Sequence, residues 1–300
     1  MAGVLNGRVA IITGAGRGIG RAYALRFAAE GAQLVLNSME NGPDGTAASS
    51  SAGQVADEIR ALGGDAVVHV GSVSSWSEGQ RMVDLAVENF GRLDVLVTNA
   101  GFLRDKMMVG MSEEDWDAVV DVHLTGQFVP LRFAAAHWRE RSKAGESFHA
   151  SVITTTAGAG LHGNVGQANY GAAKAGAAAM TIIAAREMQR LGVHVNSVAP
   201  LARTRLLETV PGLADVIGKP DDPSQFDAFD PDNLAPLAVH LASTDCRVTG
   251  QVFEVFGGRL GVYRGWSVTE RFEQDRQWTP EAIAETLAHL PTDPPPFDPS

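Results

Sequence analysis

A run of glycines directly follows the first apolar segment of the chain. Val9–Thr13 predicts a buried strand, and the residues after it read Gly-Ala-Gly-Arg-Gly-Ile-Gly from Gly14 to Gly20 before a helical stretch. Such glycines let the backbone turn tightly and let a pyrophosphate approach the N-terminus of the next helix. An ordinary glycine-rich turn is the alternative, but the strand before it and the helix after it favour a dinucleotide-binding unit.

Short β-rich runs alternate with helical stretches from the first residues to about Gly257. The predicted strands are mostly continuous apolar runs, as expected when helices cover both faces of a sheet. This alternation is typical of a doubly wound α/β fold. We therefore predict a parallel, seven-stranded Rossmann-like sheet with strands at Val9–Thr13, Gln33–Asn37, Ala66–Val70, Asp94–Thr98, Ser151–Thr155, His194–Val198 and Val252–Val255.

The length and composition indicate one domain with an appendage. A chain of 300 residues with 45% hydrophobic residues has material for one sizeable core. We predict a domain over residues 1–258 and a partly helical C-terminal extension over 259–300 with a frayed end. The polar stretch Met39–Gln54 is expected to be a surface loop, and residues 205–231 a mobile lid.

Composition also excludes several classes of function. Cys246 is the single cysteine, so no intrachain disulfide can form, and the net charge of −11 argues against binding to nucleic acid. We see no signal peptide, no apolar run of the roughly 20 residues that span a bilayer, and no histidine spacing typical of a metal site. The expectation is a cytoplasmic protein that binds a small-molecule substrate, without a metal, nucleic acid or membrane partner.

Tyr170 and Lys174 lie four residues apart in a helical stretch and therefore share one face of the helix. A tyrosine with its ordinary pKa of about 10 is a poor base at neutral pH, and a nearby cation favours the phenolate. Alone, the pair would favour the plainer interpretation of a half-buried aromatic and a solvated charge. Beside the glycine turn, it predicts a proton-transfer pair.

With Asn99-Ala100-Gly101, these two motifs follow in the order and spacing of the short-chain dehydrogenase/reductase family, which the chain resembles from about Leu5 to Gly258. The resemblance implies that Tyr170 exchanges a proton with the substrate oxygen. It also implies that Lys174 binds the nicotinamide ribose and lowers the pKa of the tyrosine. The cofactor contacts it implies are Gly14, Arg17, Gly18, Ile19, Gly20, Ser38, Ser72, Val73, Asn99, Ala100, Gly101, Tyr170, Lys174, Pro200 and Thr204.

The chain departs from the family at two members of its catalytic group. Ala157 stands where the family has a serine whose hydroxyl binds the substrate oxygen, and Thr155, Thr156 or a water could replace it; we assign Thr156. Losing one such donor costs about 100- to 1000-fold in rate, so we expect weakened activity. His123 stands where the family has an asparagine; it could hold a proton-relay water or simply be a packed helix histidine.

The positions expected to contact the adenosine part of the cofactor lack carboxylates. The family's NAD-preferring members have an aspartate where this chain has Ser38, and an acidic residue near the third strand where it has Ser72. Arg17 could approach a 2′-phosphate or merely be a surface arginine. We expect NAD, with NADP left open, and a low cofactor affinity.

Further motifs resemble one branch of the family, the (3R)-hydroxyacyl-CoA dehydrogenase domain of peroxisomal multifunctional enzyme type 2 and its bacterial steroid and acyl-CoA relatives. They are Val122-His123-Leu124, the segment from Gly163 to Tyr170, and Phe253-Glu254-Val255. The branch implies NAD(P)-dependent interconversion of a secondary alcohol and a ketone on a 3-hydroxyacyl-CoA or steroid-like substrate. Arg104, Lys106, Arg203 and Arg205 could meet a CoA phosphate.

Two alternatives remain open at this point. Ala157, Ser38 and Ser72 also suit a catalytically weakened dinucleotide-binding protein that acts as a sensor or assembly partner, and a carbonyl reductase using NADPH is the second. We further expect a homodimer or homotetramer, because Asp117–Trp138 and Gln167–Arg190 carry many small or apolar residues that could pack across a two-fold axis.

Overall fold

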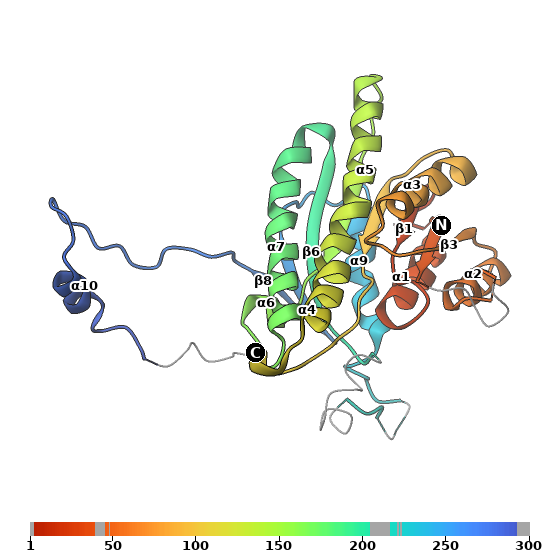
Figure 1. The fold of residues 1–300 in the computed structure, drawn as a ribbon. Coiled ribbons are helices and arrows are strands. Elements are labelled where there is room, and N and C mark those ends of the chain that lie inside the picture. Colours follow the sequence, from red (N-terminus) through yellow and green to blue (C-terminus); the bar gives the residue numbers. More distant parts are fainter. Residues whose placement is uncertain are drawn as a thin grey trace. The chain divides into compact units, whose positions relative to one another are not determined.

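One eight-stranded sheet runs through the part of the chain before residue 264, as the computed structural model shows (Figure 1). The structure describes residues 3–39, 46–47, 49–204, 217–220, 222 and 224–292. The strand order is β3-β2-β1-β4-β5-β6-β7-β8, and only the β7–β8 pair is antiparallel. The strands are β1 (Val9–Ile12), β2 (Gln33–Ser38), β3 (Ala66–Val70), β4 (Val95–Thr98), β5 (Ala150–Thr155), β6 (Val193–Leu201), β7 (Val252–Phe256) and β8 (Arg259–Tyr263).

The doubly wound α/β prediction is confirmed, and all seven predicted strands form. The strand count was wrong by one, because β8 returns after Gly257 and pairs with β7 from Val252–Tyr263 to Phe256–Arg259. Gly257 has a φ of +52°, a conformation that glycine adopts without strain. Leu260 and Val262 on β8 are exposed, so this strand lacks the buried apolar run that marked the others.

Helices cover both faces of the sheet, and two buried clusters fill the two interfaces. The first cluster joins the sheet to α1 (Gly18–Ala29), α2 (Ser51–Ala61) and α9 (Ala235–Ala242). The second joins it to α3 (Trp76–Phe90), α5 (Gly126–Lys143) and α7 (Ala168–Met188). Shorter elements are η1 (Met108–Gly110), α4 (Glu113–Val120), the π-helix η2 (Asp121–Thr125), α6 (Gly158–Leu161), η3 (Gln189–Leu191) and η4 (Pro231–Leu234).

The chain reverses its direction of travel across the sheet at β1, which pairs with β2 on one side and with β4 on the other. In such sheets, ligands bind at the carboxyl ends of the strands beside this switch point. The turn after β1, the turn after β4 and the ends of β5 and β6 all lie at that edge. The topology therefore assembles the predicted motifs from distant parts of the sequence.

Two expected irregular segments are only partly described. The end of the predicted loop Met39–Gln54 is helical instead, because α2 begins at Ser51 with the Ser50 side chain accepting a hydrogen bond from the Gly53 N–H, 3.0 Å away. Residues 40–45 and 48 lie outside the described part. So do residues 205–216, 221 and 223 of the expected lid; within the described remainder, Ile217 is buried.

The chain divides after Tyr263, beyond the expected boundary at residue 258, into units Met1–Tyr263 and Arg264–Ser300. The second unit contains α10 (Pro280–Leu287), whose first turn is capped by the Thr279 hydroxyl at the Ala282 N–H. The expected frayed end, from residue 293, is outside the described residues. In the parts of the chain that the structure describes, no helix has the length and apolar character needed to cross a membrane.

Candidate active site

The glycine turn has the backbone geometry that a phosphate-binding turn needs. Gly14 and Gly18 adopt φ values of +64° and +50°, and Gly18 begins α1. A Cβ on Gly14 would lie 2.8 Å from the Ala100 Cα, and one on Gly20 would collide with the Gly14 carbonyl. Ile19 packs against the core below the turn. The turn thus forms a cradle that side chains would fill, at the N-terminus of a helix, and it fits a dinucleotide pyrophosphate.

The turn after β4 is fastened to the turn after β1. The Thr13 hydroxyl accepts hydrogen bonds from the backbone N–H groups of Asn99, at 2.9 Å, and Ala100, at 3.1 Å. The Asn99 side-chain amide donates back to the Thr13 carbonyl at 3.2 Å. Asn99 and Ala100 therefore lie against the glycine turn, as the sequence predicted, while Thr13 is a positioning residue that sequence reasoning did not single out.

The carboxyl ends of β2 and β3 hold the adenosine-side candidates. Ser38 is buried, and its carbonyl accepts from the Gly71 N–H at 3.0 Å. The Ser72 hydroxyl lies 2.9 Å from that of Ser74. Val73 is buried against Gly126, where a Cβ would lie 2.5 Å from the valine Cγ2. Ser38 and Ser72 thus lie at the carboxyl ends of β2 and β3, and neither position carries a carboxylate.

A buried polar chain lies beneath these serines. The Asn37 amide donates to the Gly71 carbonyl at 3.0 Å and lies 3.0 Å from the His69 Nδ1, and the His69 Nε2 lies 3.0 Å from the Glu78 carboxylate. The Asn37 Oδ1 accepts from the Gly14 N–H at 3.4 Å. Burial lowers the pKa of His69 even though Glu78 acts to raise it. This chain connects α3 to the glycine turn.

Tyr170 and Lys174 lie on α7 and share one face, as predicted. The Lys174 Nζ lies 5.6 Å from the centre of the Tyr170 ring and donates to the Thr155 carbonyl at 2.7 Å. Lys174 is almost fully buried, and burial lowers its pKa to about 7. The Lys174 amine is thereby anchored at the end of β5, and it is partly deprotonated at physiological pH.

The expectation that Lys174 lowers the pKa of Tyr170 is not met by the chain on its own. Burial raises the pKa of Tyr170 above its ordinary value, and the Asp105 carboxylate raises it further. The reason is that both members of the pair are buried, so each loses hydration of its charged form. Proton transfer at Tyr170 therefore needs a further positive charge beside it.

His123 lies in the π-helix between α4 and α5, and such a turn often marks a functional position. Its ring is 4.9 Å from the Tyr170 ring, centre to centre and perpendicular to it, and its Nε2 lies 2.6 Å from the Phe102 carbonyl. Burial, then Lys174, lowers its pKa to about 3, so the imidazole is neutral. The Nδ1 atom is buried without a hydrogen-bond partner in the described structure.

This position of His123 depends on a missing side chain opposite it. A Cβ on Gly101 would collide with the imidazole ring. Gly101 therefore contributes space for His123 at the end of the turn that follows β4. The ring contact with Tyr170 and the unpaired Nδ1 place His123 beside the predicted proton-transfer pair, and its role as a proton relay stays a prediction.

Thr156 does not offer its hydroxyl to a substrate. The residue is fully buried, and its hydroxyl donates to the Lys174 carbonyl at 2.7 Å. The assignment of Thr156 as the replacement donor was therefore wrong, because the hydrogen is used within the packing of α7 against β5. Ala157 is half-buried in extended backbone (φ −159°) and precedes α6, so the position of the family serine carries no hydroxyl.

The end of β6 brings Thr204 to the glycine turn. Pro200 lies within β6 opposite Val255, and a Cβ on Gly18 would be 3.4 Å from the Thr204 methyl carbon. Arg17, the residue before α1, is exposed. Thr204 and Arg17 thus both lie next to Gly18, Thr204 in space and Arg17 in the chain.

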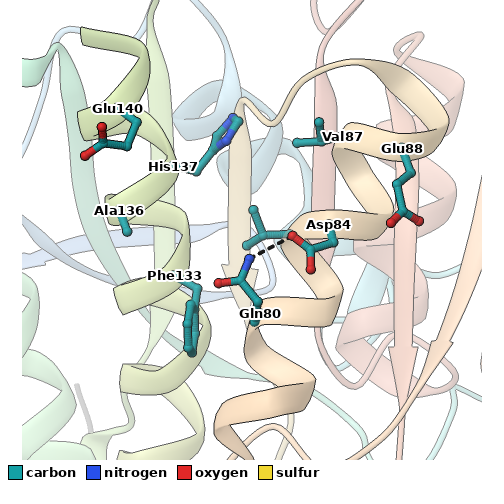
Figure 2. Close-up of a pocket in the computed structure, with 9 residues that line it drawn as sticks. Gln80, Asp84, Val87, Glu88, Phe133, Ala136, His137 and Glu140 are labelled. Carbon is teal, nitrogen blue, oxygen red and sulfur yellow. Dashed lines mark hydrogen bonds between the residues drawn. The ribbon is translucent and has the colours of Figure 1, made fainter. Parts of the chain in front are cut away.

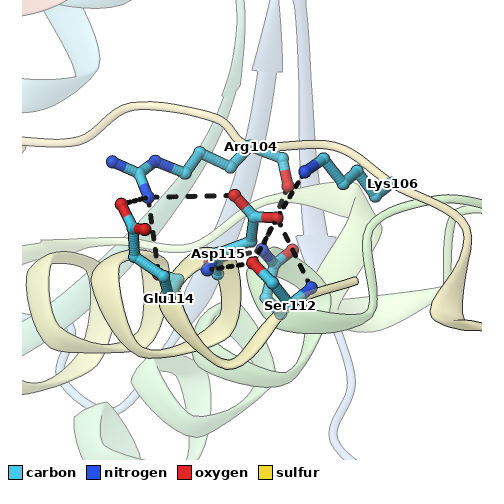
Figure 3. A network of polar contacts seen from close by, with 6 residues as sticks. Arg104, Lys106, Ser112, Glu114 and Asp115 are labelled. Atoms are coloured by element: carbon cyan, nitrogen blue, oxygen red, sulfur yellow. Dashed lines mark hydrogen bonds and ion pairs between the residues drawn. The ribbon is translucent and has the colours of Figure 1, made fainter. Parts of the chain in front are cut away.

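Two of the cations that could have met a CoA phosphate, Arg104 and Lys106, are paired with carboxylates in the network that Figure 3 shows. Arg104 forms an ion pair with Glu114 at 2.9 Å, and Lys106 with Asp115 at 2.6 Å. The Lys106 ammonium, then the Ser112 hydroxyl, lowers the pKa of Asp115 to about 2. Arg203 binds Asp227 at 2.8 Å. The structure thus gives these three cations other partners, and Arg205 lies outside the described residues.

Sequence reasoning missed two amides that organise the site. Asn169, next to Tyr170, donates to the Arg104 carbonyl at 3.1 Å and the Asp115 carbonyl at 3.0 Å, which ties the loop after β4 to the start of α7. Gln127, on α5, contacts β4, β5 and the π-helix. The available signal was their spacing: Asn169 precedes the tyrosine, and Gln127 is one helical turn after His123.

A surface pocket of about 370 Å³ lies between α3 and α5 (Figure 2). Its lining residues are Gln80, Val83, Asp84, Val87, Glu88, Phe133, Ala136, His137 and Glu140. None of them belongs to the glycine turn or to the helix carrying Tyr170. Within the described residues, no three His, Cys, Asp or Glu side chains are grouped to hold a metal ion.

Known proteins match most of the length of this chain. Residues 8–209 match the family model described as short chain dehydrogenase. The chain is 40% identical over 292 residues to hydroxyacyl-CoA dehydrogenase ChsB1 of Mycobacterium tuberculosis, covering 94% of this chain and 88% of that protein. It is 38% identical over 284 residues to peroxisomal multifunctional enzyme type 2 of Mus musculus, covering 93% of this chain but 36% of that longer protein.

A solved structure agrees with these matches. The crystal structure of a short chain dehydrogenase from Mycobacterium avium superposes with a TM-score of 0.87 at 46% identity, covering 96% of this chain and 95% of that one. The family's fold, glycine turn and Tyr-Lys pair are all present in the geometry described above. This chain therefore belongs to the short-chain dehydrogenase family and is an oxidoreductase that acts on CH–OH groups with NAD(P).

Proposed function

We propose that this chain oxidises the hydroxyl of a 3-hydroxyacyl-CoA, using NAD. The observation that carries the reaction type is the buried Tyr170–Lys174 pair anchored to the Thr155 carbonyl beside the glycine turn. The substrate class is supported by the relative from Mycobacterium tuberculosis, whose name is hydroxyacyl-CoA dehydrogenase and which matches nearly the whole chain. A steroid-like alcohol is the second substrate class that the assay below includes.

The roles of the chain's own residues follow from their positions. Tyr170 accepts the proton of the substrate hydroxyl, and we assign the onward relay of that proton to Lys174 and the neutral His123, which lie beside its ring. The glycine turn, Asn99 and Thr204 would hold the dinucleotide. The nicotinamide, when bound, supplies the hydride acceptor and the further positive charge that lowers the pKa of Tyr170.

NAD is proposed over NADP on electrostatic grounds. The Glu78 carboxylate lies above Gly71, where a Cβ would come 2.6 Å from its Oε2, at the end of β3 next to β2. A negative charge at this end of the site disfavours a 2′-phosphate more than it disfavours two ribose hydroxyls. Arg17 is the opposing charge, and its exposure weakens its effect.

The comparisons do not support the alternative of a binding protein without turnover, because the similar proteins of Mycobacterium tuberculosis and Mus musculus are both named as enzymes.

A cytoplasmic location and assembly into a homodimer or homotetramer stay predictions. Phe128 on α5 and Ile183 on α7 are exposed apolar side chains on two helices that were expected to pack across a two-fold axis. Light scattering of the purified protein measures the assembly directly.

The test of the proposed activity is an absorbance assay with NAD and with NADP on a panel of (3R)- and (3S)-hydroxyacyl-CoA, the matching free acids and hydroxysteroids. We expect turnover of a hydroxyacyl-CoA with NAD. Tyr170→Phe should lower kcat by about 10³-fold while the dissociation constant for NAD stays within about twofold. Turnover of steroids alone would overturn the substrate class, and calorimetric binding of neither nucleotide would overturn the cofactor proposal.

A further inference from the structure

The carbonyl that anchors Lys174 lies at a place where the sheet lacks a strand. β4 ends at Thr98, opposite Thr154, whereas β5 continues to Thr155. Along a parallel pair, alternate residues direct their N–H and C=O groups to the same neighbouring strand. The Thr156 N–H bonds to Val198 of β6, so the Thr155 groups face the side of β4. Because β4 has turned away there, the Thr155 peptide groups need other partners.

The side-chain amide of Gln127 supplies those partners. Its Oε1 accepts from the Thr155 N–H at 3.0 Å, and its Nε2 donates to the Thr155 carbonyl at 2.9 Å. The amide therefore pairs with Thr155 as a residue of a neighbouring strand would. Gln127 is buried, so water cannot substitute for it.

The other half of the same amide connects the two remaining elements of the site. The Thr98 hydroxyl donates to the Gln127 Oε1 at 2.9 Å, and the Thr155 N–H, which can only donate, determines that this end of the amide is the oxygen. The Nε2 donates a second time, to the His123 carbonyl at 2.8 Å. All four hydrogen-bonding positions of the amide are thus occupied, two as acceptor and two as donor.

Two groups around Tyr170, Lys174 and His123, consequently depend on one side chain. Lys174 donates to the Thr155 carbonyl at 2.7 Å, so the direction of this carbonyl determines where the buried ammonium lies. The His123 carbonyl fixes the turn from which the imidazole reaches the Tyr170 ring. We propose that Gln127 is a positioning residue for the reaction, because its amide holds both the peptide that anchors Lys174 and the turn that carries His123.

The expected effect of Gln127 on catalysis rests on the proposed function. Its expected effect on the position of Lys174 and of the Thr155 peptide does not, because Lys174 and the Thr155 amide can be observed without substrate. A residue that merely fills the core would change stability alone. A positioning residue must also change the titration of Lys174 and the rate of the chemical step.

The decisive variant is Gln127→Met, which keeps the volume and removes the amide. The matched control is Asn196→Leu: Asn196 is equally buried and its amide also bridges backbone groups, at Val248 and Gln251, but it belongs to the β6–β7 side of the sheet. Both variants should lose similar thermal stability, since each leaves buried backbone groups unpaired.

The first readout needs no cofactor. The chain has four lysines, Lys106, Lys143, Lys174 and Lys219, so a ¹³C-lysine NMR titration resolves Lys174, which Lys174→Met assigns. In Gln127→Met we expect the titration midpoint of Lys174 to fall, because the Thr155 carbonyl that accepts from the charged amine is no longer held in place. We also expect faster hydrogen exchange at the Thr155 amide. The Asn196→Leu variant should show neither change.

The second readout is the pH profile of turnover with NAD and the hydroxyacyl-CoA identified by the assay above. We expect kcat in Gln127→Met to fall at least tenfold with KM within about threefold, and the pH-dependent limb to move with the Lys174 midpoint. If Gln127→Met and Asn196→Leu lose stability alike while the Lys174 midpoint in Gln127→Met stays or rises and kcat is unchanged, the proposal is overturned.

Thr98→Val keeps the proposal testable if Gln127→Met does not fold. It removes one of the two groups that donate to the Gln127 Oε1, and we expect the same direction of change at about threefold in kcat. An unchanged kcat together with an unchanged Lys174 midpoint in Thr98→Val counts against the positioning role. If the wild-type protein turns over no hydroxyacyl-CoA at all, the proposed substrate fails, while the exchange and lysine readouts still decide the role of Gln127.

Discussion

The two ends of the dinucleotide site are built differently. At the end that carries the chemistry, Lys174 donates to the buried Thr155 carbonyl and His123 lies against the Phe102 carbonyl, and Tyr170, Lys174 and His123 each have a shifted pKa. At the adenosine end, Ser38 and Ser72 provide hydroxyls in place of carboxylates, and Glu78, on another element, brings a negative charge to the end of β3. The catalytic end thus has buried groups whose charges respond to their surroundings. At the adenosine end, discrimination between NAD and NADP depends on a carboxylate from another element.

The difference teaches where this chain depends on exact geometry. A buried ammonium and a buried phenol respond strongly to small displacements, because the surrounding dielectric is low. A hydroxyl-lined, partly exposed adenosine end tolerates change, because water screens its charges. Substitutions at the catalytic end should therefore change rates by large factors, whereas those at the adenosine end should change nucleotide preference or stability more modestly.

The largest effect is expected from restoring the missing hydroxyl at the catalytic end. Ala157→Ser adds a donor where the backbone is already extended and the residue is half-exposed, so the change costs little in stability. One oxyanion donor contributes about 100- to 1000-fold, and an unoptimised one should still raise kcat by about 10- to 100-fold. Steady-state kinetics with NAD measures this gain.

The matched control for that substitution is Ala159→Ser, which adds the same hydroxyl two residues further on, within α6. It should leave kcat within about twofold of the wild type. A kcat for Ala157→Ser equal to that of both the wild type and the control would mean that another group already donates to the substrate oxygen, and the contrast between the two ends would weaken.

The second prediction concerns the adenosine end and is smaller. Ser38→Asp places a carboxylate at the end of β2, where it can bind the ribose hydroxyls and repel a 2′-phosphate. We expect the ratio of the dissociation constants of NADP and NAD to rise about tenfold in calorimetric titrations, which corresponds to about 1.4 kcal/mol. Ser38→Asn, of similar size and without charge, should leave the ratio within about twofold. A ratio that Ser38→Asp leaves unchanged would place the ribose away from β2.

How far the sequence could predict this molecule depended on how local each signal was. The parallel strands were predictable because buried strands are continuous apolar runs, and Gly14 to Gly20 and the Tyr170–Lys174 pair were predictable because each is one contiguous motif. The sequence did not predict β8, because its side chains are exposed or half-buried and it therefore has no buried apolar run.

The features that sequence could not predict are those built from several elements. Gln127 acquires its role from Thr98, Thr155 and His123, which lie on three separate segments. The pKa of Tyr170 could not be read from the lysine four residues away, because the burial of both groups opposes the charge that the spacing suggests. Thr156 was misassigned because its partner, the Lys174 carbonyl, is distant in sequence.

The smallest effect tests whether the buried chain at the adenosine end is as sensitive to charge as the catalytic end. Burial lowers the pKa of His69 below the value of about 6.5 that it has in the unfolded chain, and Glu78 and Arg81 are the charges that act on it. Below pH 6.5 the unfolded state binds a proton that the folded state does not bind, so stability falls as the pH falls.

His69→Gln can still bond to Asn37 and Glu78 but cannot titrate. Between pH 7.5 and 5.5 the variant should lose less stability than the wild type, seen as a smaller decrease in Tm. His240→Gln, at an exposed position on α9, should keep the wild-type slope; an equal slope in His69→Gln would show that His69 takes up its proton without cost and that the adenosine end is effectively solvated.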